Sequence, residues 1–454
     1  MTGTDKKQTS AVSPTALILE AAVRAKKASR ELARLSHENR VKALTAMADA
    51  IDAAAKDILK ANALDIASMD KQEPTPELDV LKKRLALNES KILDITRSIR
   101  EVCKLPDPIG QKLMSRELDS DLILHKVACP IGLVAVIFES RPDALPQILS
   151  LCLKSGNGAL LKGGREAEQT NKQIFACIQK SLVQNDINPE VFALTHKRED
   201  VEALLSAKGT VDLIIPRGSN ALVSHIMSNT QIPVLGHAAG ICHIYVDKEA
   251  DLHKALRICI DAKTSYPAAC NAVETILVHE NAATRFLPDL LQSFENMRVE
   301  SRCDEKCKQL VKSMVKSIDL GMVKDATADD FGTEFSNLIV AVKIVDSIDA
   351  AIQHINDNSS NHTDAIVTED TSAAERFFEL VDSAGVYLNA STRFADGFRY
   401  GFGAEVGISN GKLHPRGPVG LDGLTTYKYR LVGKGHIVAD YSGANARQFS
   451  HKDL

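Results

Sequence analysis

The sequence predicts an α/β protein with two doubly wound parallel-sheet domains and an extended β-ribbon arm. At 454 residues the chain is too long for one compact core. Strand and helix patterns alternate from about residue 130 to Val246, and again from Lys248 to Thr392. Such β-α-β order is typical of parallel sheets. Residues 420–441 instead alternate as an extended ribbon does.

The first hundred residues are predicted to be mostly helical. Ser13 and Pro14 form a helix start, with Ser as the N-cap and Pro in the first turn. Ser36 opens a second helix, rich in Ala and Leu, that is expected to run to about Asp65. A third helical region is expected from Glu77 to Val102.

The two alternating regions are then assigned from apolar runs and their breaks. "GLVAVIFE" is a continuous apolar run, as expected for a strand buried on both faces. The other expected elements of the first region are the helix "DALPQILSLCLKSGN", the strand "GALLKGG", the helix "QTNKQIFACIQKSLVQND", the strand–turn–helix "VDLIIPRGSNALVSHIMSN" and the strand "ICHIYVD". Those of the second are the helix "DLHKALRICIDAKT" and the strands "VETILVH", "LIVAVKIV" and "TDAIVTE".

Composition and charge exclude several functional classes. The net charge is −4, from 55 basic and 59 acidic residues, so nothing favours a nucleic-acid partner. No apolar run reads as a membrane span, and the polar N-terminus does not resemble a signal peptide. Nine cysteines then fit free thiols in a reducing cytoplasm. Cys303 and Cys307 could share a helix face, but no paired Cys or His motif accompanies them, so no metal site is expected.

Three motifs follow predicted strands of the first α/β region. They are "FESRP" (residues 138–142), "KGGRE" (162–166) and "PRGSNA" (216–221). Lys162 with Gly163 and Gly164 offers a cation beside a flexible backbone, and Gly218-Ser219 offers helix-start amides for a phosphate. Each motif alone would pass for a turn, but three at one sheet edge favour a nucleotide site. The Gly-x-Gly-x-x-Gly motif that is usual in dinucleotide-binding sites does not follow the first strand. The nearest match, at Gly401, Gly403 and Gly407, has the wrong spacing and lies far downstream.

Cys270, in "TSYPAACNAVETILVH", is the candidate nucleophile. A free cysteine is most often a small buried hydrophobe. This one follows Pro267 in a predicted loop, has small neighbours that a substrate could approach, and opens the second α/β region. A thiolate there would be a strong nucleophile, although no His or Lys adjoins it in sequence to lower its pKa.

Two polar loops are candidates for substrate binding. "HINDNSSNHTDAIV" holds His354 and His362, and it is either a polar surface turn or a binding loop. "NASTRFADGFRYGFGAEVGIS" holds Asn389, Arg393 and Arg399, and its arginines could bind carboxylate or phosphate.

From Thr15 to Tyr429 the chain resembles the γ-glutamyl phosphate reductases (glutamate-5-semialdehyde dehydrogenases), a branch of the aldehyde dehydrogenase superfamily, and the fungal members look closest. The resemblance rests on "FESRP", "LKGG", "DLIIPRGSNALV", "CHIYVD", "YPAACNAVETILVH", "HINDNSSNHTDAIV", "NASTRFADGFRYGFGAEVGIS" and "LHPRGPVGLDGLTTYKY". One departure is Asn358, where the family usually has His or Tyr.

The resemblance assigns roles to individual residues. It implies that Cys270 is the catalytic thiol, with its backbone N–H and Asn271 as candidate oxyanion donors, and that Glu334 holds the nicotinamide ribose. The other implied NADPH contacts are Glu139, Ser140, Pro142, Lys162, Gly163, Gly164, Pro216, Arg217, Gly218 and Ser219. The candidate substrate contacts are Arg141, His354, His362, Asn389, Thr392 and Arg393, with Arg217 as a further one.

The resemblance also implies a domain layout. An NADPH-binding domain is expected from residues 15–111 and 130–246, with 397–412 returning to it, and a catalytic domain from 247–396. An oligomerisation ribbon is expected from 112–129 and 413–442, between an N-terminal tail (1–14) and a C-terminal tail (443–454).

Two departures from the hydrolytic aldehyde dehydrogenases indicate the reaction. Their general-base glutamate is replaced by "LGHAAG", with His237 near that place, and their oxyanion asparagine falls near Ser140. A reductase that starts from an acyl phosphate must exclude water. The implied activity is therefore NADPH-dependent reduction of L-glutamyl 5-phosphate to the 5-semialdehyde, the second step from glutamate to proline.

Other interpretations and partners follow from the same likeness. Another aldehyde dehydrogenase-fold oxidoreductase, aldehyde-oxidising or acyl-CoA-forming, is one alternative, and a non-catalytic NADP-binding paralogue is another. Intact Cys270, Lys162 and Glu334 argue against the paralogue. A separate glutamate 5-kinase is implied as the source of the labile substrate and as a transient partner. The terminal ribbon implies a homo-oligomer, either a dimer or a tetramer of dimers.

Overall fold

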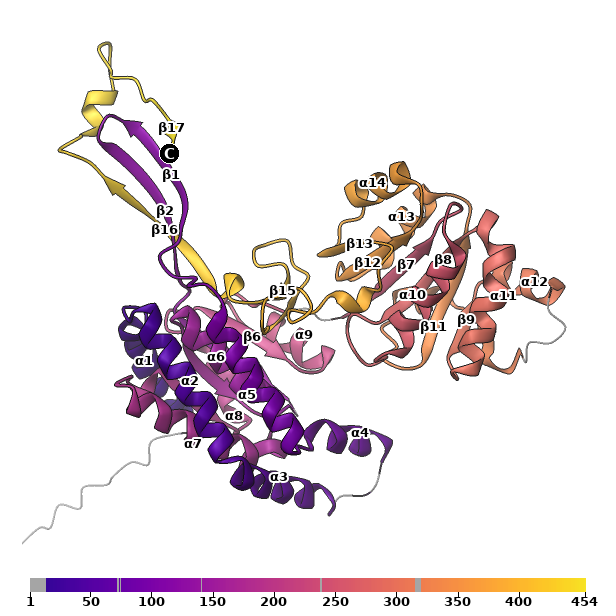
Figure 1. Ribbon diagram of the computed structural model, residues 1–454, viewed down its shortest axis with the longest axis horizontal. Coiled ribbons are helices and arrows are strands. Elements are labelled where there is room, and N and C mark those ends of the chain that lie inside the picture. The colour runs from indigo at the N-terminus through magenta and orange to yellow at the C-terminus, as the bar shows by residue number, and fades with distance from the viewer. Residues whose placement is uncertain (1–13, 72, 74, 140, 237–238, 315–319) are drawn as a thin grey trace, which may run out of the picture. The chain divides into compact units, whose positions relative to one another are not determined.

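The computed structural model describes residues 14–71, 73, 75–139, 141–236, 239–314 and 320–454 (Figure 1). The chain divides into two compact units. Unit 1 comprises Met1–Leu235, Phe402–Gly407 and Gly420–Leu454, and unit 2 comprises Gly236–Gly401 and Ile408–Val419. Unit 1 is therefore assembled from segments that are distant in sequence, whereas unit 2 is interrupted only at residues 402–407.

Unit 1 is built on a parallel sheet, as the alternating pattern predicts. Within the described residues its order is β5-β4-β3-β6. The strands are β3 (Leu133–Phe138), β4 (Gly158–Lys162), β5 (Phe192–Thr195) and β6 (Leu213–Arg217). Every residue of β3 is buried, which agrees with its unbroken apolar run. The ends of β3, β4 and β6 lie at one edge, since Phe138 pairs with Arg217 and Ile137 with Lys162.

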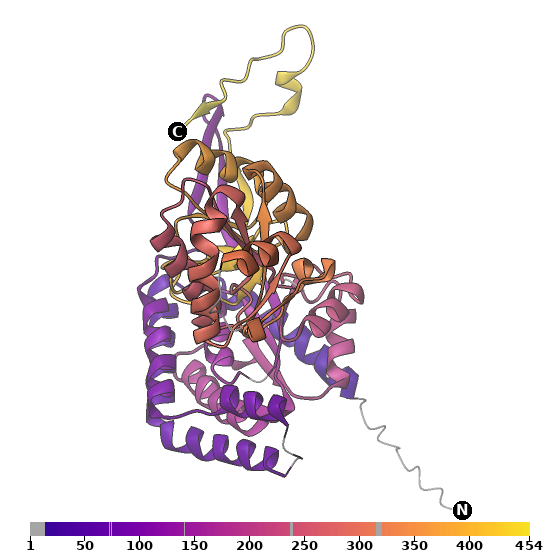
Figure 2. The same ribbon diagram turned by 90° about the vertical axis from the view of Figure 1, so that its right-hand side faces the viewer.

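Helices cover this sheet and form the N-terminal part of the unit. They are α1 (Pro14–Leu32), α2 (His37–Ala53), α3 (Ala55–Met69), α4 (Pro76–Leu85), α5 (Glu89–Lys104), α6 (Ala144–Ser155), α7 (Glu168–Gln184), α8 (Glu199–Ser206) and α9 (Asn220–Ser228). The amphipathic α5 packs against α2 and α6. Figure 2 shows the indigo and purple helices of this part of the chain after a turn of 90°. The predicted N-cap Ser13 lies outside the described residues.

Two of the predicted helices are in fact pairs. The helix expected from Ser36 is broken at Ala54, where the backbone turns to φ −94° and ψ 7°. The sequence there is all good helix formers, so no local signal marks the break. The helical region from Glu77 is divided before α5, because Asn88 acts as N-cap and accepts a hydrogen bond from the Lys91 amide at 2.8 Å.

The ribbon is an antiparallel sheet of distant segments. Its order is β16-β2-β1-β17 among the described residues, and Figure 1 shows yellow β16 beside β2. The strands are β1 (Lys112–Asp119), β2 (Leu122–Pro130), β16 (Thr425–Val432) and β17 (Lys452–Asp453). The end of the chain was expected to be a tail, but Leu454 donates its amide to Ser115 at 3.0 Å, and Asp453 pairs with Arg116. Because these contacts join segments that are far apart in the chain, no local sequence pattern predicts them.

Unit 2 contains a larger parallel sheet of order β10-β9-β11-β8-β7-β12-β13, counted over the described residues. Its strands are β7 (Cys242–Val246), β8 (Val273–His279), β9 (Glu300–Cys303), β10 (Val323–Asp325), β11 (Ile339–Val345), β12 (Thr363–Val367) and β13 (Gly385–Leu388). The helices are α10 (Leu252–Thr264), α11 (Glu280–Asn296), α12 (Glu305–Met314), α13 (Ile348–Asn358) and α14 (Thr371–Leu380). A small separate pair is β14 (Gly407–Ser409) with β15 (Gly417–Val419).

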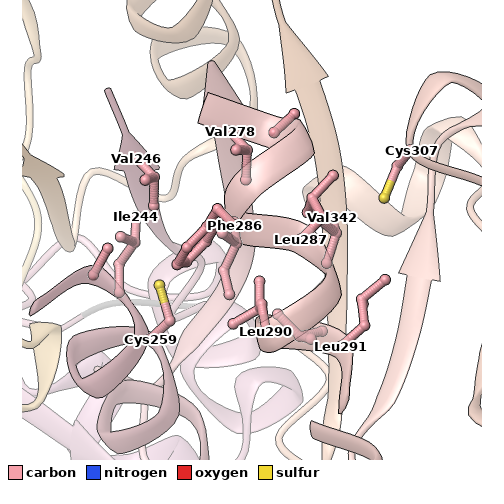
Figure 3. Packing of buried hydrophobic residues seen from close by; sticks show 14 of the residues in the cluster. Ile244, Val246, Cys259, Val278, Phe286, Leu287, Leu290, Leu291, Cys307 and Val342 are labelled. Atoms are coloured by element: carbon pink, nitrogen blue, oxygen red, sulfur yellow. The ribbon is translucent and has the colours of Figure 1, made fainter. Parts of the chain in front are cut away.

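An apolar core fixes α10 and α11 on one face of this sheet. Phe286 and Leu290 of α11 pack with Ile244 of β7 and Cys259 of α10, and Figure 3 shows these side chains pointing toward one another. Cys259 is fully buried, and burial raises the pKa of its thiol far above the usual value. It is the inert structural kind of cysteine.

The structure divides the chain slightly differently from the sequence expectation. Strand β7, expected in the first domain, pairs with β8 and β12 of the unit 2 sheet. A fully buried apolar strand does not reveal from its periodicity which sheet it joins. Residues 413–419, expected in the ribbon, lie in unit 2, where Lys412 and Arg416 pair with Asp382.

The return to unit 1 involves residues 402–407 rather than all of 397–412.

In the described parts of the chain, no helix has the length and apolar character needed to cross a membrane.

Candidate active site

Cys270 lies in the turn between α10 and β8, outside the core of unit 2. The turn is held by backbone hydrogen bonds from Ala269 to Tyr266 (3.2 Å) and from Ala272 to Ala269 (2.9 Å). Cys270 is half-buried, and Ala268 and Ala269 before it are also only partly buried. The thiol thus has the partial exposure and small neighbours that a nucleophile requires.

Gly240 runs directly against the Cys270 turn. A Cβ at position 240 would lie 2.2 Å from the Cys270 carbonyl oxygen and 2.6 Å from its Cα, closer than any real contact. The Gly240 amide donates to Glu334 Oε2 at 2.9 Å. The absence of a side chain at 240 therefore brings Glu334 and Cys270 to the same short backbone segment.

Cys242, a residue that sequence patterns did not single out, contacts the backbone of the Cys270 turn. Its thiol donates to the Cys270 carbonyl at 3.4 Å and lies 3.8 Å from Nδ1 of His362. Burial raises the pKa of Cys242 well above its usual value, so the thiol stays protonated and remains a donor. His362 also has Nδ1 2.9 Å from Oγ1 of Thr363. His362 is thereby connected to the Cys270 turn through one thiol.

The predicted anion-binding loop packs against the same turn. Asn271 Nδ2 donates to the Ala395 carbonyl at 2.9 Å, and Arg393 Nε donates to Ser265 Oγ at 3.1 Å. Burial lowers the pKa of Arg393, neighbouring Arg399 lowers it further, and Cys270 acts in the opposite direction. Arg393 is thus a positive group within electrostatic range of Cys270, although the two are remote in sequence. The Asn271 amide that was predicted as an oxyanion donor holds the loop in place.

Two other predicted substrate residues, His354 and Asn389, make contacts away from the Cys270 turn. His354 is buried edge-on against His243 and Phe331, with ring centroids 5.6 and 5.3 Å apart, and burial lowers its pKa to about 3. Asn389 exchanges hydrogen bonds with the backbone of residue 368, and Thr392 is fully buried. These contacts hold the fold of unit 2 together.

Asp364 forms a second buried polar centre that the sequence did not predict. Its carboxylate accepts hydrogen bonds from the His243 amide (2.7 Å), the His243 ring (3.0 Å) and the hydroxyls of Ser359 and Ser383. These donors fix the loop that precedes His362. The only sequence signal was an acidic residue inside an otherwise apolar strand.

In unit 1 the end of β4 and the turn after it contain Lys162, Gly163 and Gly164, which were predicted to contact the nucleotide. Lys162 is half-buried, and burial lowers its pKa. A Cβ at Gly163 would lie 2.7 Å from Asn171 Nδ2, and one at Gly164 would lie 2.0 Å from Glu166 Oε1. A side chain at Gly163 would therefore crowd the buried Asn171, whereas the Glu166 side chain could rotate away from one at Gly164.

A pocket of about 510 Å³ adjoins this turn. Its charged and polar lining includes Arg165, Glu168, Lys172, His196, Lys197 and Glu199. Lys172 Nζ donates a hydrogen bond to Glu168 Oε1 at 2.6 Å, so the charge of that carboxylate is paired within the pocket lining. The buried Nε2 of His196 has no hydrogen-bond partner within the described chain. Buried polar atoms are normally satisfied, so this nitrogen indicates a missing ligand or water. Together with the cations, the residues present fit an anionic nucleotide.

The other two strand-end motifs meet at the start of α9. Ser219 caps this helix, and its amide donates to Glu139 Oε2 at 3.0 Å. A Cβ at Gly218 would lie 2.5 Å from that same oxygen. A phosphate bound at this helix start would compete with Glu139 for the Ser219 amide.

The remaining predicted residues of these motifs differ in burial and contacts. Pro142 and Pro216 are buried, and Arg141 is exposed, with its carbonyl accepting from the Ala144 amide at 3.0 Å. Arg217 reaches the Glu405 carbonyl at 3.5 Å. Ser140 and His237 lie outside the described residues. Across the residues that the structure describes, no three His, Cys, Asp or Glu side chains gather as a metal site.

Comparison with known proteins decides the family. The aldehyde dehydrogenase family profile matches residues 6–329. A gamma-glutamyl phosphate reductase of Trichormus variabilis is 50% identical over 429 residues, which cover 94% of this chain and 96% of that protein. This chain belongs to the gamma-glutamyl phosphate reductases of the aldehyde dehydrogenase family. The family and fold predicted from the sequence are thereby confirmed.

Solved structures of gamma-glutamyl phosphate reductases agree with this membership. That of the Thermotoga maritima protein has a TM-score of 0.88 and 38% identity, covering 92% of this chain and 99% of that one. That of the Saccharomyces cerevisiae protein has a TM-score of 0.51 and 36% identity, covering 95% of this chain and all of that one. These identities do not single out the fungal members, so the fungal likeness stays a prediction.

Proposed function

We propose that this protein reduces L-glutamyl 5-phosphate to L-glutamate 5-semialdehyde with release of phosphate, using NADPH, in the second step of proline biosynthesis. The observation that carries the proposal is the half-buried Cys270, set against Gly240 and Glu334. Relatives that share half of their residues with this chain bear the name of this reductase.

Cys270 acts as the nucleophile in this proposal. Its thiolate attacks the acyl carbon of the substrate, the carbon–oxygen bond to phosphate breaks, and a thioester forms on the sulfur. NADPH, when bound, supplies the hydride that reduces this thioester carbonyl. The resulting thiohemiacetal then collapses, which releases the semialdehyde and regenerates the thiolate. Arg393, whose side chain lies against the Cys270 turn, is a positive group that can bind the anionic substrate.

Backbone donors support the oxyanion in each step. The Cys270 amide is the first candidate, because the Asn271 side chain is engaged with Ala395. Glu334 is proposed to hold the nicotinamide ribose, and Lys162, Gly218 and Ser219 of unit 1 are proposed to hold the adenosine end. Arg393, which contacts the Cys270 turn, is the preferred substrate contact. His362 is buried and is proposed to support the turn through Cys242.

Replacement of the nucleophile tests the proposal. Cys270→Ala is expected to abolish phosphate-dependent reduction of NADP⁺ with the semialdehyde while NADP⁺ still binds, as measured by calorimetry. Cys259→Ala, a buried thiol of the same unit, is the control and should retain turnover. Activity in Cys270→Ala would contradict the mechanism. Phosphate-independent oxidation by the unaltered protein would instead favour an aldehyde-oxidising enzyme.

We further propose that the protein is a homo-oligomer joined through its ribbon, that it works in the cytoplasm, and that a glutamate 5-kinase delivers its labile substrate. The exposed apolar side chains of β16 support the first point, and nine free cysteines support the second.

A further inference from the structure

Unit 2 contains a fully buried ion pair next to the residues proposed to act in the reaction. Lys263, in the last turn of α10, donates from Nζ to Glu274 Oε2 at 2.6 Å and to the Val273 carbonyl at 3.1 Å. Both side chains are 0% exposed. Burying two charges costs more free energy than packing apolar side chains of the same size, so such a pair is weak evidence for stability alone. Its presence calls for a second role.

The other carboxylate oxygen of Glu274 points to that role. Oε1 accepts a hydrogen bond from the Ser336 amide at 3.3 Å. Ser336 has φ +51°, in the left-handed region that residues other than glycine rarely adopt. A strained backbone persists only where its surroundings fix it, and Glu274 supplies that constraint.

The strained turn leads directly to Glu334. Ser336 Oγ lies 3.4 Å from Glu334 Oε1, and Glu334 Oε2 accepts from the Gly240 amide at 2.9 Å. Gly240 in turn lies against Cys270. A continuous series of contacts therefore runs from the ion pair to the ribose-binding glutamate and the segment beside the nucleophile.

We propose that Lys263 and Glu274 are positioning residues of the reductase, which hold the turn at Ser336 so that Glu334 is aimed at the cofactor ribose. Burial raises the pKa of Glu274 to about 7, and Lys263 opposes this rise and orients the carboxylate. Glu274 in turn keeps the turn left-handed. The inference rests on the proposed function, because it takes Glu334 to be a cofactor contact.

A charge-free replacement separates positioning from folding. In the double variant Lys263→Met/Glu274→Leu no buried charge is left unpaired, so the fold should persist. We expect its affinity for NADP⁺, measured by calorimetry, to fall about tenfold and KM for NADPH to rise similarly, with a smaller change in kcat. Tyr245→Phe is the matched control, because it removes a buried 2.9 Å hydrogen bond to Asp247 elsewhere in unit 2. It should lower stability without changing NADP⁺ affinity.

A rescue experiment covers the case in which the double variant does not fold. Glu274→Gln should weaken NADP⁺ binding, because its single side-chain oxygen replaces the two that accept from Lys263 and Ser336. Adding Ser336→Gly should restore part of the affinity, because glycine adopts the left-handed turn without help. Unchanged NADP⁺ affinity in the double variant, or no recovery on adding Ser336→Gly, would overturn the positioning role.

The unaltered protein and Glu334→Gln distinguish this failure from failure of the proposed function. If the unaltered protein does not bind NADP⁺, or Glu334→Gln binds it equally well, the cofactor assignment itself is wrong and the positioning role falls with it.

Discussion

At the scale of single residues, close backbone approach matters as much as side-chain chemistry. Gly240 places no functional group near Cys270, yet a single added carbon there would collide with the Cys270 carbonyl and Cα. Because the colliding atoms belong to the backbone, no side-chain rotation can relieve the contact. The glycine is thus a requirement of the nucleophile's position.

Gly240→Ala is therefore expected to displace Cys270 and to lower kcat by about 100-fold, since a misplacement of about 1 Å can cost that much. The rate of Cys270 alkylation by iodoacetamide, followed by mass spectrometry, should change in parallel. Gly332→Ala is the control, because nothing lies within 4 Å of a Cβ at that position. Unchanged turnover in Gly240→Ala would show that the Cys270 turn can move freely.

At the scale of elements, the ribbon presents an exposed apolar edge. Strand β16 lies at one end of its sheet as described, and Tyr427, Tyr429 and Leu431 are 47–58% exposed. Unpaired edge strands readily add a further strand, which proteins normally prevent with charges or proline. β16 carries charges at Lys428 and Arg430, but Tyr427, Tyr429 and Leu431 form an exposed apolar row, which supports the proposed ribbon interface.

Leu431→Lys is expected to weaken self-association, because a lysine on an edge strand opposes pairing with another chain. Light scattering coupled to size-exclusion chromatography should give a lower mass for the variant than for the unaltered protein at micromolar concentration. Lys428→Gln, on the other face of β16, is the control and should leave the mass unchanged. A monomeric unaltered protein would rule out the ribbon interface.

At the scale of the whole molecule, buried histidine makes stability depend on pH. Burial lowers the pKa of His354 to about 3, from a model-compound value of 6.5. The unfolded chain therefore takes up a proton at this site before the folded chain does. The contribution of neutral His354 to the free energy of unfolding is complete above about pH 6.5. It is lost as the pH falls toward 3, by at most about 1.4 kcal/mol per pH unit.

His354→Gln should consequently flatten the loss of stability on acidification. Between pH 7.5 and 5, we expect the unaltered protein to lose about 1–2 kcal/mol more unfolding free energy than the variant, as measured by urea denaturation. His253→Gln, at an exposed position, is the control. An equal pH dependence for His354→Gln and the unaltered protein would mean that His354 titrates similarly in both states.

The sequence by itself determined the fold class and the strand-end motifs, and it singled out Cys270 as the candidate nucleophile. Apolar periodicity is a local property, so β3 and the other strands of continuous apolar residues could be predicted with their order along the chain. Cys270 could be separated from the buried cysteines because its neighbours are small and a proline precedes it. Residue spacing and motif likeness likewise identified the family.

The tertiary structure alone decided which residues meet. Lys263 and Glu274 stood out in the sequence only as charges within apolar patterns, and nothing local paired them or linked them to Ser336. The contact of Gly240 with Cys270, the nearness of Arg393, and the burial of His354 also join segments far apart in the chain. Such approaches depend on how whole elements pack, and the free energy of that packing is not encoded in any short stretch of sequence.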